Sequence, residues 1–202
     1  MSSTGLLVEH PLLAAAGRAS TALGTAARAA AWQLADDQVQ DAIALTLIAE
    51  ARLAALRANL IAEADLRGLR DRTQSSTTVR WLEGRYRLSG PDARTRVEQA
   101  DVLVRHPRVT DALADGAVTV EQASVIAAAL DQVADLPLVE PEEREQAAVF
   151  LIEAAQDLIP RELARAGAQI LERLTRTPTA DDPAEEGALA REQRRAEEEA
   201  EA

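Results

Sequence analysis

Apolar residues recur at helical spacing along most of this 202-residue chain. The longest such pattern covers residues 36–66, where large apolar side chains stand mostly three or four positions apart, as on one face of a helix. Asp36 or Asp37 can cap this segment at its start, and Gly68 ends it. The pattern predicts one long helix with an apolar face made of Val39, Ile43, Leu47, Leu53, Leu56 and Leu60.

Capping and breaking residues mark further helices. Residues 11–35 are rich in Ala and are interrupted by Gly17 and Gly24, which is typical of a helix with weak points. The polar segment 73–78 can cap a short helix whose apolar residues are Val79, Trp81 and Leu82. Ser89 can cap a helix that follows the turn at residues 88–90, with Pro91 in its first turn and an apolar stripe of Ala93, Val97, Ala100 and Val104.

The second half of the chain also contains helix-capping and helix-stopping residues. A short helix over 109–115 ends at Gly116, and Thr119 with Gln122 forms a capping box for a helix that runs through residue 133. Pro141 and Pro160 each open another helix. The inward positions are expected at Ala147, Leu151, Ala154 or Ala155 and Leu158 in the first of these, and at Leu163, Ala166 or Gly167, Ile170 and Leu174 in the second.

Two segments share one layout thirty positions apart, which suggests a repeated helix-turn-helix unit. In each, an apolar residue and a hydroxyl-bearing cap precede an inward Ala, namely Leu88-Ser89 with Ala93 and Val118-Thr119 with Ala123. Ala supplies 44 of the 202 residues, and no segment alternates as a strand would. The chain is therefore expected to be all-α, a multi-helix bundle with short helix-turn-helix units and one long helix.

Composition changes near both ends and suggests three parts. Residues 1–35 form an Ala-rich helical segment, 36–176 a helical core, and 177–202 a charged linker or solvated helix that lacks large apolar residues other than Leu189. The uncharged stretches fall far short of the roughly 20 residues that span a bilayer. No secretory leader is evident, and the absence of Cys gives no indication of an oxidising compartment, so we expect a cytoplasmic protein.

The residues expected in common catalytic sites are missing. His10 and His106 are the only histidines, and there is no Cys and no Lys. Zinc sites, Ser-His catalysis, phosphate-binding P-loops and Schiff-base chemistry therefore lack their usual groups. His106 before Pro107 is interpreted as a helix C-terminal cap, and the acids around Pro141 complement a helix dipole. We predict no catalytic residue, no metal site and no cofactor.

The distribution of charge along the chain gives the one positive indication of function. Residues 67–108 hold ten Arg against five acidic residues, whereas the rest of the chain holds twelve Arg against twenty-nine acidic residues. Such a confined basic segment fits a nucleic-acid contact, although a solvated face paired with acidic residues would look similar. The candidate DNA-binding residues are Arg80, Arg85, Arg87, Arg94 and Arg96, with Gln99 near bases on the second helix of a helix-turn-helix.

Several segments in order resemble the actinobacterial 13E12 repeat family, also called domain of unknown function 222. The resemblance covers about residues 36–176 and rests on Trp81-Leu82, the run Leu88-Ser89-Gly90-Pro91-Asp92-Ala93-Arg94, residues 113–123, residues 125–130 and Ile159-Pro160-Arg161-Glu162-Leu163. It implies a helical region that commonly precedes an HNH endonuclease domain. The histidine-rich nuclease motif is absent here, so no catalytic residue is carried over.

Two hypotheses of different classes remain open. In the first, the chain is a non-catalytic, DNA-engaging or targeting module of a nuclease-type protein. In the second, it is a protein-interaction scaffold or oligomerisation domain that binds a partner or another copy of itself. One exposed face shared by the arginines favours DNA, and pairing of the arginines with acids favours the scaffold.

Overall fold

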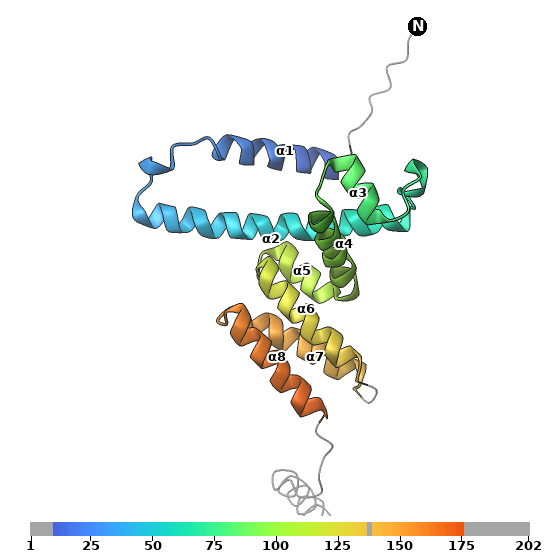
Figure 1. Ribbon diagram of the computed structural model, residues 1–202. Helices are drawn as coiled ribbons and strands as arrows, with labels where there is room; N and C mark the ends of the chain where they lie inside the picture. Colours follow the sequence, from blue (N-terminus) through green and yellow to red (C-terminus); the bar gives the residue numbers. More distant parts are fainter. Residues whose placement is uncertain (1–9, 137–138, 176–202) are drawn as a thin grey trace, which may run out of the picture. The chain divides into compact units, whose positions relative to one another are not determined.

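A computed structural model of the chain describes residues 10–136 and 139–175 (Figure 1). Over these residues the chain forms eight α-helices and no strand, which confirms the all-helical prediction. The helices are α1 (Pro11–Ala26), α2 (Asp36–Leu66), α3 (Thr78–Tyr86), α4 (Gly90–Arg105), α5 (Pro107–Asp115), α6 (Val120–Ala134), α7 (Pro141–Ala154) and α8 (Pro160–Thr175). Single 3₁₀ turns occur at Ala31–Gln33 and Asp71–Thr73. None of the described helices combines the length and apolar character that a bilayer crossing requires.

The chain divides into two compact units, Met1–Leu45 and Thr46–Ala202, and the division falls within α2. The N-terminal unit contains α1, the turn at Ala31–Gln33 and the start of α2. α1 is shorter than the predicted helix and ends at Ala26, where the N–H of Ala27 still donates to the Leu23 carbonyl. The charged linker predicted for residues 177–202 lies outside the described residues.

The core of the second unit is built from α3–α8 and the second half of α2. α2 buries mainly small residues along one side of the helix: Ala51, Ala54, Ala55, Ala58 and Ala64, together with Ile61. Its predicted apolar face points elsewhere, since Leu53 is 51% exposed and Leu60 is 46% exposed. Alanine lets two helix axes approach closely, so the side with small residues packs best.

α2 is also joined to its neighbours by polar contacts. Arg52 donates to the Asp115 carbonyl at the end of α5 (3.1 Å), and the Thr78 hydroxyl donates to Asp65. The side chain of Ile48 lies against Gly116, where an added Cβ would meet it at 2.6 Å. Gly116 adopts φ +76° and stops α5, as predicted.

Capping residues place the later helices as predicted. Thr119 and Gln122 form the capping box of α6, and the Gln122 amide also donates to the Ala155 carbonyl (2.7 Å) and the Leu158 carbonyl (3.1 Å), so that one side chain joins α6 to the end of α7. α6 and α8 pack so closely that a Cβ added at Gly167 would lie 2.7 Å from the Ala129 Cβ. Leu163 of α8 is fully buried in the same core.

The predicted stripe of α4 is wrong at its last position. Ala93 and Ala100 are fully buried as expected, whereas Val104 is 57% exposed. Leu103 takes the core position instead, at 7% exposure. The helix turns by about 100° per residue, so a shift of one position at the end of a stripe moves a side chain from core to surface.

Candidate nucleic-acid interface

α3, the turn after it and α4 form the helix-turn-helix expected from the sequence. The Thr77 hydroxyl accepts the Arg80 N–H (3.1 Å) at the start of α3, and the Ser89 hydroxyl accepts the Asp92 N–H (3.3 Å) at the start of α4. Arg87 ends α3 in the left-handed conformation at φ +58°. Side-chain caps at both helix starts and this backbone reversal fix the turn at residues 87–89.

Apolar anchors hold the pair in place. Trp81 and Leu82 of α3 are buried, as are Ala93 and Ala100 of α4. The Trp81 and Tyr86 rings meet edge to face with centroids 5.7 Å apart, which is a favourable aromatic geometry. The anchors therefore fix the direction in which the polar side chains of both helices project.

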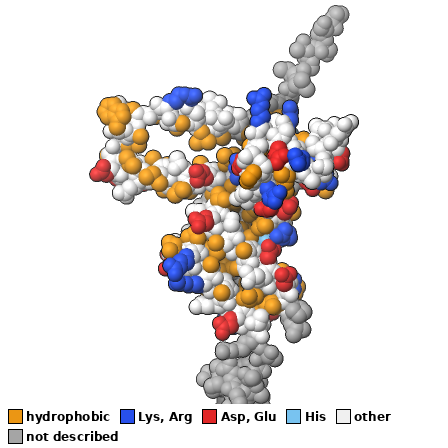
Figure 2. All heavy atoms as spheres, in the orientation of Figure 1, with side chains coloured by type: hydrophobic (Ala, Val, Ile, Leu, Met, Phe, Trp, Pro, Cys, Tyr) orange, Lys and Arg blue, Asp and Glu red, His pale blue; other side chains and the backbone are white. Residues whose placement is uncertain are grey.

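Four of the predicted arginines are exposed on this unit, and we refer to them together as the arginine surface: Arg80, Arg85, Arg87 and Arg94. Arg80 has a distant acidic neighbour, Glu83, at 3.9 Å, and its side chain is 74% exposed. An exposed pair at that separation contributes little. Figure 2 shows arginine side chains over α3 and α4 with acidic side chains among them. Exposed guanidinium groups offer planar hydrogen-bond donors suited to phosphate oxygens.

The other two predicted residues lie differently. Arg96 is half-buried, and its Nε donates to the Asp92 carboxylate (3.2 Å) within the same helix. Partial burial, and after it the nearby charge of Arg96, lower the pKa of Arg57 on α2, while Asp92 acts in the opposite direction. Gln99 is half-buried and lines a hollow of about 280 Å³ between α4 and α6. Arg96 and Gln99 therefore face neighbouring helices rather than the arginine surface.

A polar cluster that the sequence analysis did not find joins α4 and α5 to α6. Asp131 accepts hydrogen bonds from Arg105 (2.9 Å) and pairs with His106 Nε2 (2.9 Å). His106 links α4 to α5, as the C-terminal cap interpretation expected, and the buried Thr110 hydroxyl donates to the Leu103 carbonyl (2.7 Å) beside it. Asp131 lies 25 positions from His106, and no spacing rule connects two residues so far apart in sequence.

This cluster predicts a pH dependence of stability. Hydrogen bonding from Arg105, with a smaller contribution from His106, lowers the pKa of the Asp131 carboxyl below its usual range despite partial burial. A carboxyl whose pKa is lower in the folded state stabilises the fold above its unfolded pKa of about 4, and this contribution disappears as pH falls through the folded pKa. Asp131→Asn should lower the free energy of unfolding by about 1 kcal/mol at pH 7, measured by urea unfolding.

The matched control is Asp135→Asn, at an exposed residue that follows α6. The difference between wild type and Asp131→Asn should shrink towards pH 3, whereas the control should differ little from wild type at either pH. A deficit of the same size at pH 7 and pH 3 would show that the Asp131 charge is not the cause.

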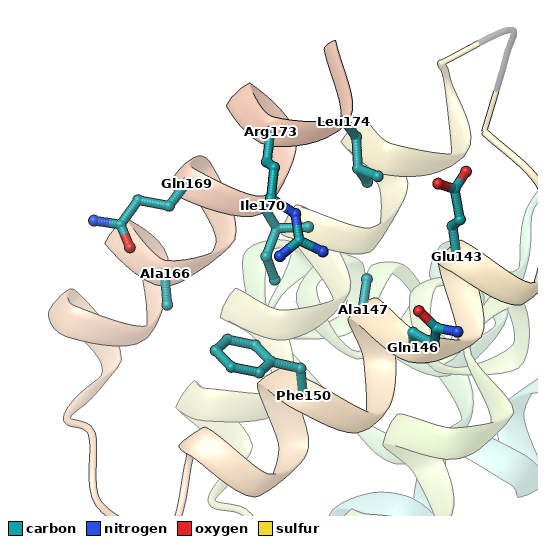
Figure 3. A pocket seen from close by; sticks show the side chains of 9 residues that line it. All are labelled: Glu143, Gln146, Ala147, Phe150, Ala166, Gln169, Ile170, Arg173 and Leu174. Carbon is teal, nitrogen blue, oxygen red and sulfur yellow. The ribbon is translucent and has the colours of Figure 1, made fainter. Parts of the chain in front are cut away.

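A groove between α7 and α8 is a second hollow that the sequence did not indicate (Figure 3). Its volume is about 480 Å³. Phe150 and Ala147 of α7 face Ile170 and Ala166 of α8, and Glu143, Gln146, Gln169, Arg173 and Leu174 complete the lining. Mostly apolar walls with a polar edge can accept an apolar side chain.

Over residues 10–136 and 139–175, no three His, Asp or Glu side chains gather in a way that could hold a metal ion. The fold and the arginine surface define an all-helical protein whose most distinctive polar feature is a helix-turn-helix with exposed guanidinium groups. A family model, the domain of unknown function DUF222, matches residues 40–200, and the chain therefore belongs to that family. No curated protein and no solved structure matches the chain.

Proposed function

We propose that this chain is a non-catalytic, DNA-engaging module that contacts the phosphate backbone through the arginine surface. The observation that supports it most is the exposure of Arg80, Arg85, Arg87 and Arg94 on one capped helix-turn-helix of an otherwise acidic chain. Arg85, Arg87 and Arg94 have no acidic partner within 4.0 Å in the described structure. Guanidinium groups in such a position are available to phosphate rather than committed to stabilising the fold.

We also propose that the chain works together with an endonuclease domain. The 13E12 repeat proteins of actinobacteria, which this chain resembles, commonly place such a helical region ahead of an HNH endonuclease domain. The chain's two histidines, His10 and His106, are too few for an HNH centre. We therefore assign it positioning or targeting of DNA in the cytoplasm rather than cleavage, with no metal and no cofactor of its own.

A salt series with labelled duplex and single-stranded DNA tests the proposal. If four phosphates are neutralised, the slope of log Kobs against log salt on duplex DNA should be about −3.6, which weakens binding roughly 100-fold between 50 and 200 mM. Changing Arg80, Arg85, Arg87 and Arg94 together to Gln should abolish this dependence. These side chains are exposed, so circular dichroism should show an unchanged helix content.

The matched control changes four exposed arginines of α7 and α8, namely Arg144, Arg161, Arg165 and Arg173, to Gln. Both variants carry the same net charge, so only the position of the lost charges differs. Equal loss of binding in both would show a general charge effect and no dedicated surface. Absence of binding by the intact chain at 50 mM salt would overturn the proposal and leave the protein-interaction scaffold.

A further inference from the structure

The N-terminal unit exposes apolar side chains throughout its described residues. None of residues 10–45 is buried. Large apolar side chains in this unit are more than a third exposed, and we call six of them the N-terminal apolar surface: Leu13 (59%), Leu23 (47%), Trp32 (83%), Leu34 (42%), Val39 (37%) and Leu45 (66%). Figure 2 shows hydrophobic side chains along α1, the connection and the start of α2.

Helices of this kind are not stable by themselves in water. Most helical stability in proteins comes from packing an apolar face, and Ala-rich helices shorter than about 15 residues are marginal in isolation. α1 has 16 residues and contains Gly17 and Gly24, which weaken it. Two helices alone also lack the second layer that encloses a core. The exposed residues therefore indicate a surface that is covered in the working protein.

The size of the surface fits a specific interface. Six side chains exposed to these fractions present on the order of 700 Å². A standard interface buries about 800 Å² on each partner. Isolated exposed leucines are ordinary on a protein surface, whereas this much exposed apolar area within one short unit is typical of an interaction site.

The charges of this unit fit a second copy of the chain. Residues 11–35 carry Arg18 and Arg28 and no acid, whereas residues 36–45 carry Asp36, Asp37 and Asp41 and no base. Pairing α1 and the residues just after it in one copy with the start of α2 of another brings opposite charges together twice, because Arg18 lies on α1 and Arg28 just beyond its end. Pairing α1 with α1, or α2 with α2, brings like charges together. The surface is thus self-complementary in the manner of a two-fold symmetric interface.

We propose that two copies of this chain associate through the N-terminal apolar surface, each α1 lying along the start of the partner's α2. Two helical hairpins pack in this way as a four-helix bundle, which encloses the leucines and Trp32 in one core. The family match begins at residue 40, so most of this surface belongs to a segment that the family model does not include. Self-association does not depend on the DNA proposal.

Sedimentation velocity of the full chain over a concentration series tests the pairing. We expect a dimer that dissociates on dilution. Changing Leu23, Trp32 and Leu45 together to Gln should raise the dissociation constant at least about 100-fold, because central apolar residues carry most of the binding energy. The control changes three exposed apolar residues of the other unit, Leu66, Val104 and Ile159, to Gln and should leave the dimer intact.

A mixing experiment distinguishes pairing between chains from packing within one chain. One variant carries Arg18→Glu and Arg28→Glu, and the other carries Asp36→Arg and Asp41→Arg. Each alone opposes like charges in the proposed dimer and should be monomeric, whereas an equimolar mixture should form a heterodimer, because every α1–α2 contact between the two chains is then attractive. A monomeric wild type, a dimer that survives the Leu23, Trp32 and Leu45 changes, or a mixture that stays monomeric would overturn the proposal.

Discussion

Replacing Leu163 by Ala is expected to lower the free energy of unfolding by about 3 kcal/mol. Leu163 lies in the first turn of α8 and is fully buried, in a region where α6 and α8 approach closely enough that Gly167 has no room for a Cβ beside Ala129. Removing its outer carbons loses their transfer free energy and leaves a cavity that two closely packed helices cannot close. Urea unfolding followed by circular dichroism measures the change.

The matched control is Leu66→Ala, since Leu66 is 83% exposed at the end of α2. The same chemical change at an exposed position should alter stability by no more than about 0.5 kcal/mol. If the two variants are equally stable, Leu163 is not part of the core, and the packing of α8 on α6 described above is wrong.

Gly116→Ala is expected to cost about 2–3 kcal/mol. Gly116 has φ +76° after the last turn of α5, a backbone conformation in which a side chain is strained. Its added Cβ would also lie 2.6 Å from Ile48 Cγ2 on α2, so the two helices would have to separate. Thermal or urea unfolding should show the loss as a single shifted transition.

Two other glycines distinguish the effect of the backbone conformation from that of the contact with Ile48. Gly68 has a similar φ of +61°, but its Cβ would meet only the end of the flexible Asp71 side chain, so Gly68→Ala should cost about 1 kcal/mol. Gly17 lies within α1 with nothing within 4 Å, and Gly17→Ala should favour the helix by up to about 1 kcal/mol. Equal costs at Gly116 and Gly68 would show that the contact with Ile48 contributes nothing.

The DNA and self-association proposals can fail separately, because their variants change different residues. The arginine surface lies on α3 and α4, and the N-terminal apolar surface lies within residues 13–45. If both proposals hold, a dimer carries two arginine surfaces, and binding to a long duplex gains avidity that depends on the concentration of the protein. The Leu23, Trp32 and Leu45 variant should then bind long DNA more weakly while its binding to short duplexes is unchanged.

The sequence alone determined where most helices begin and end. Capping is local chemistry, in which a hydroxyl or carboxylate a few positions away satisfies a free backbone N–H. Thr77, Ser89, Thr119 with Gln122, and Gly116 therefore behave as their types predict. The exception is the end of α1, which stops at Ala26, since an Ala-rich run contains no residue that marks where it ends.

Only the tertiary structure decided which side of α2 is buried. α2 has a side with leucines and a side with alanines, and both satisfy the helical period, so the pattern could not show that the alanines pack. For the same reason, the sequence analysis predicted Arg96 and Gln99 on an exposed face of α4. In the structure, α2 and α6 partly cover these two residues. The contact of Asp131 with Arg105 and His106 also required the fold, because hydrogen bonding between distant residues depends on how helices cross and not on their spacing in the chain.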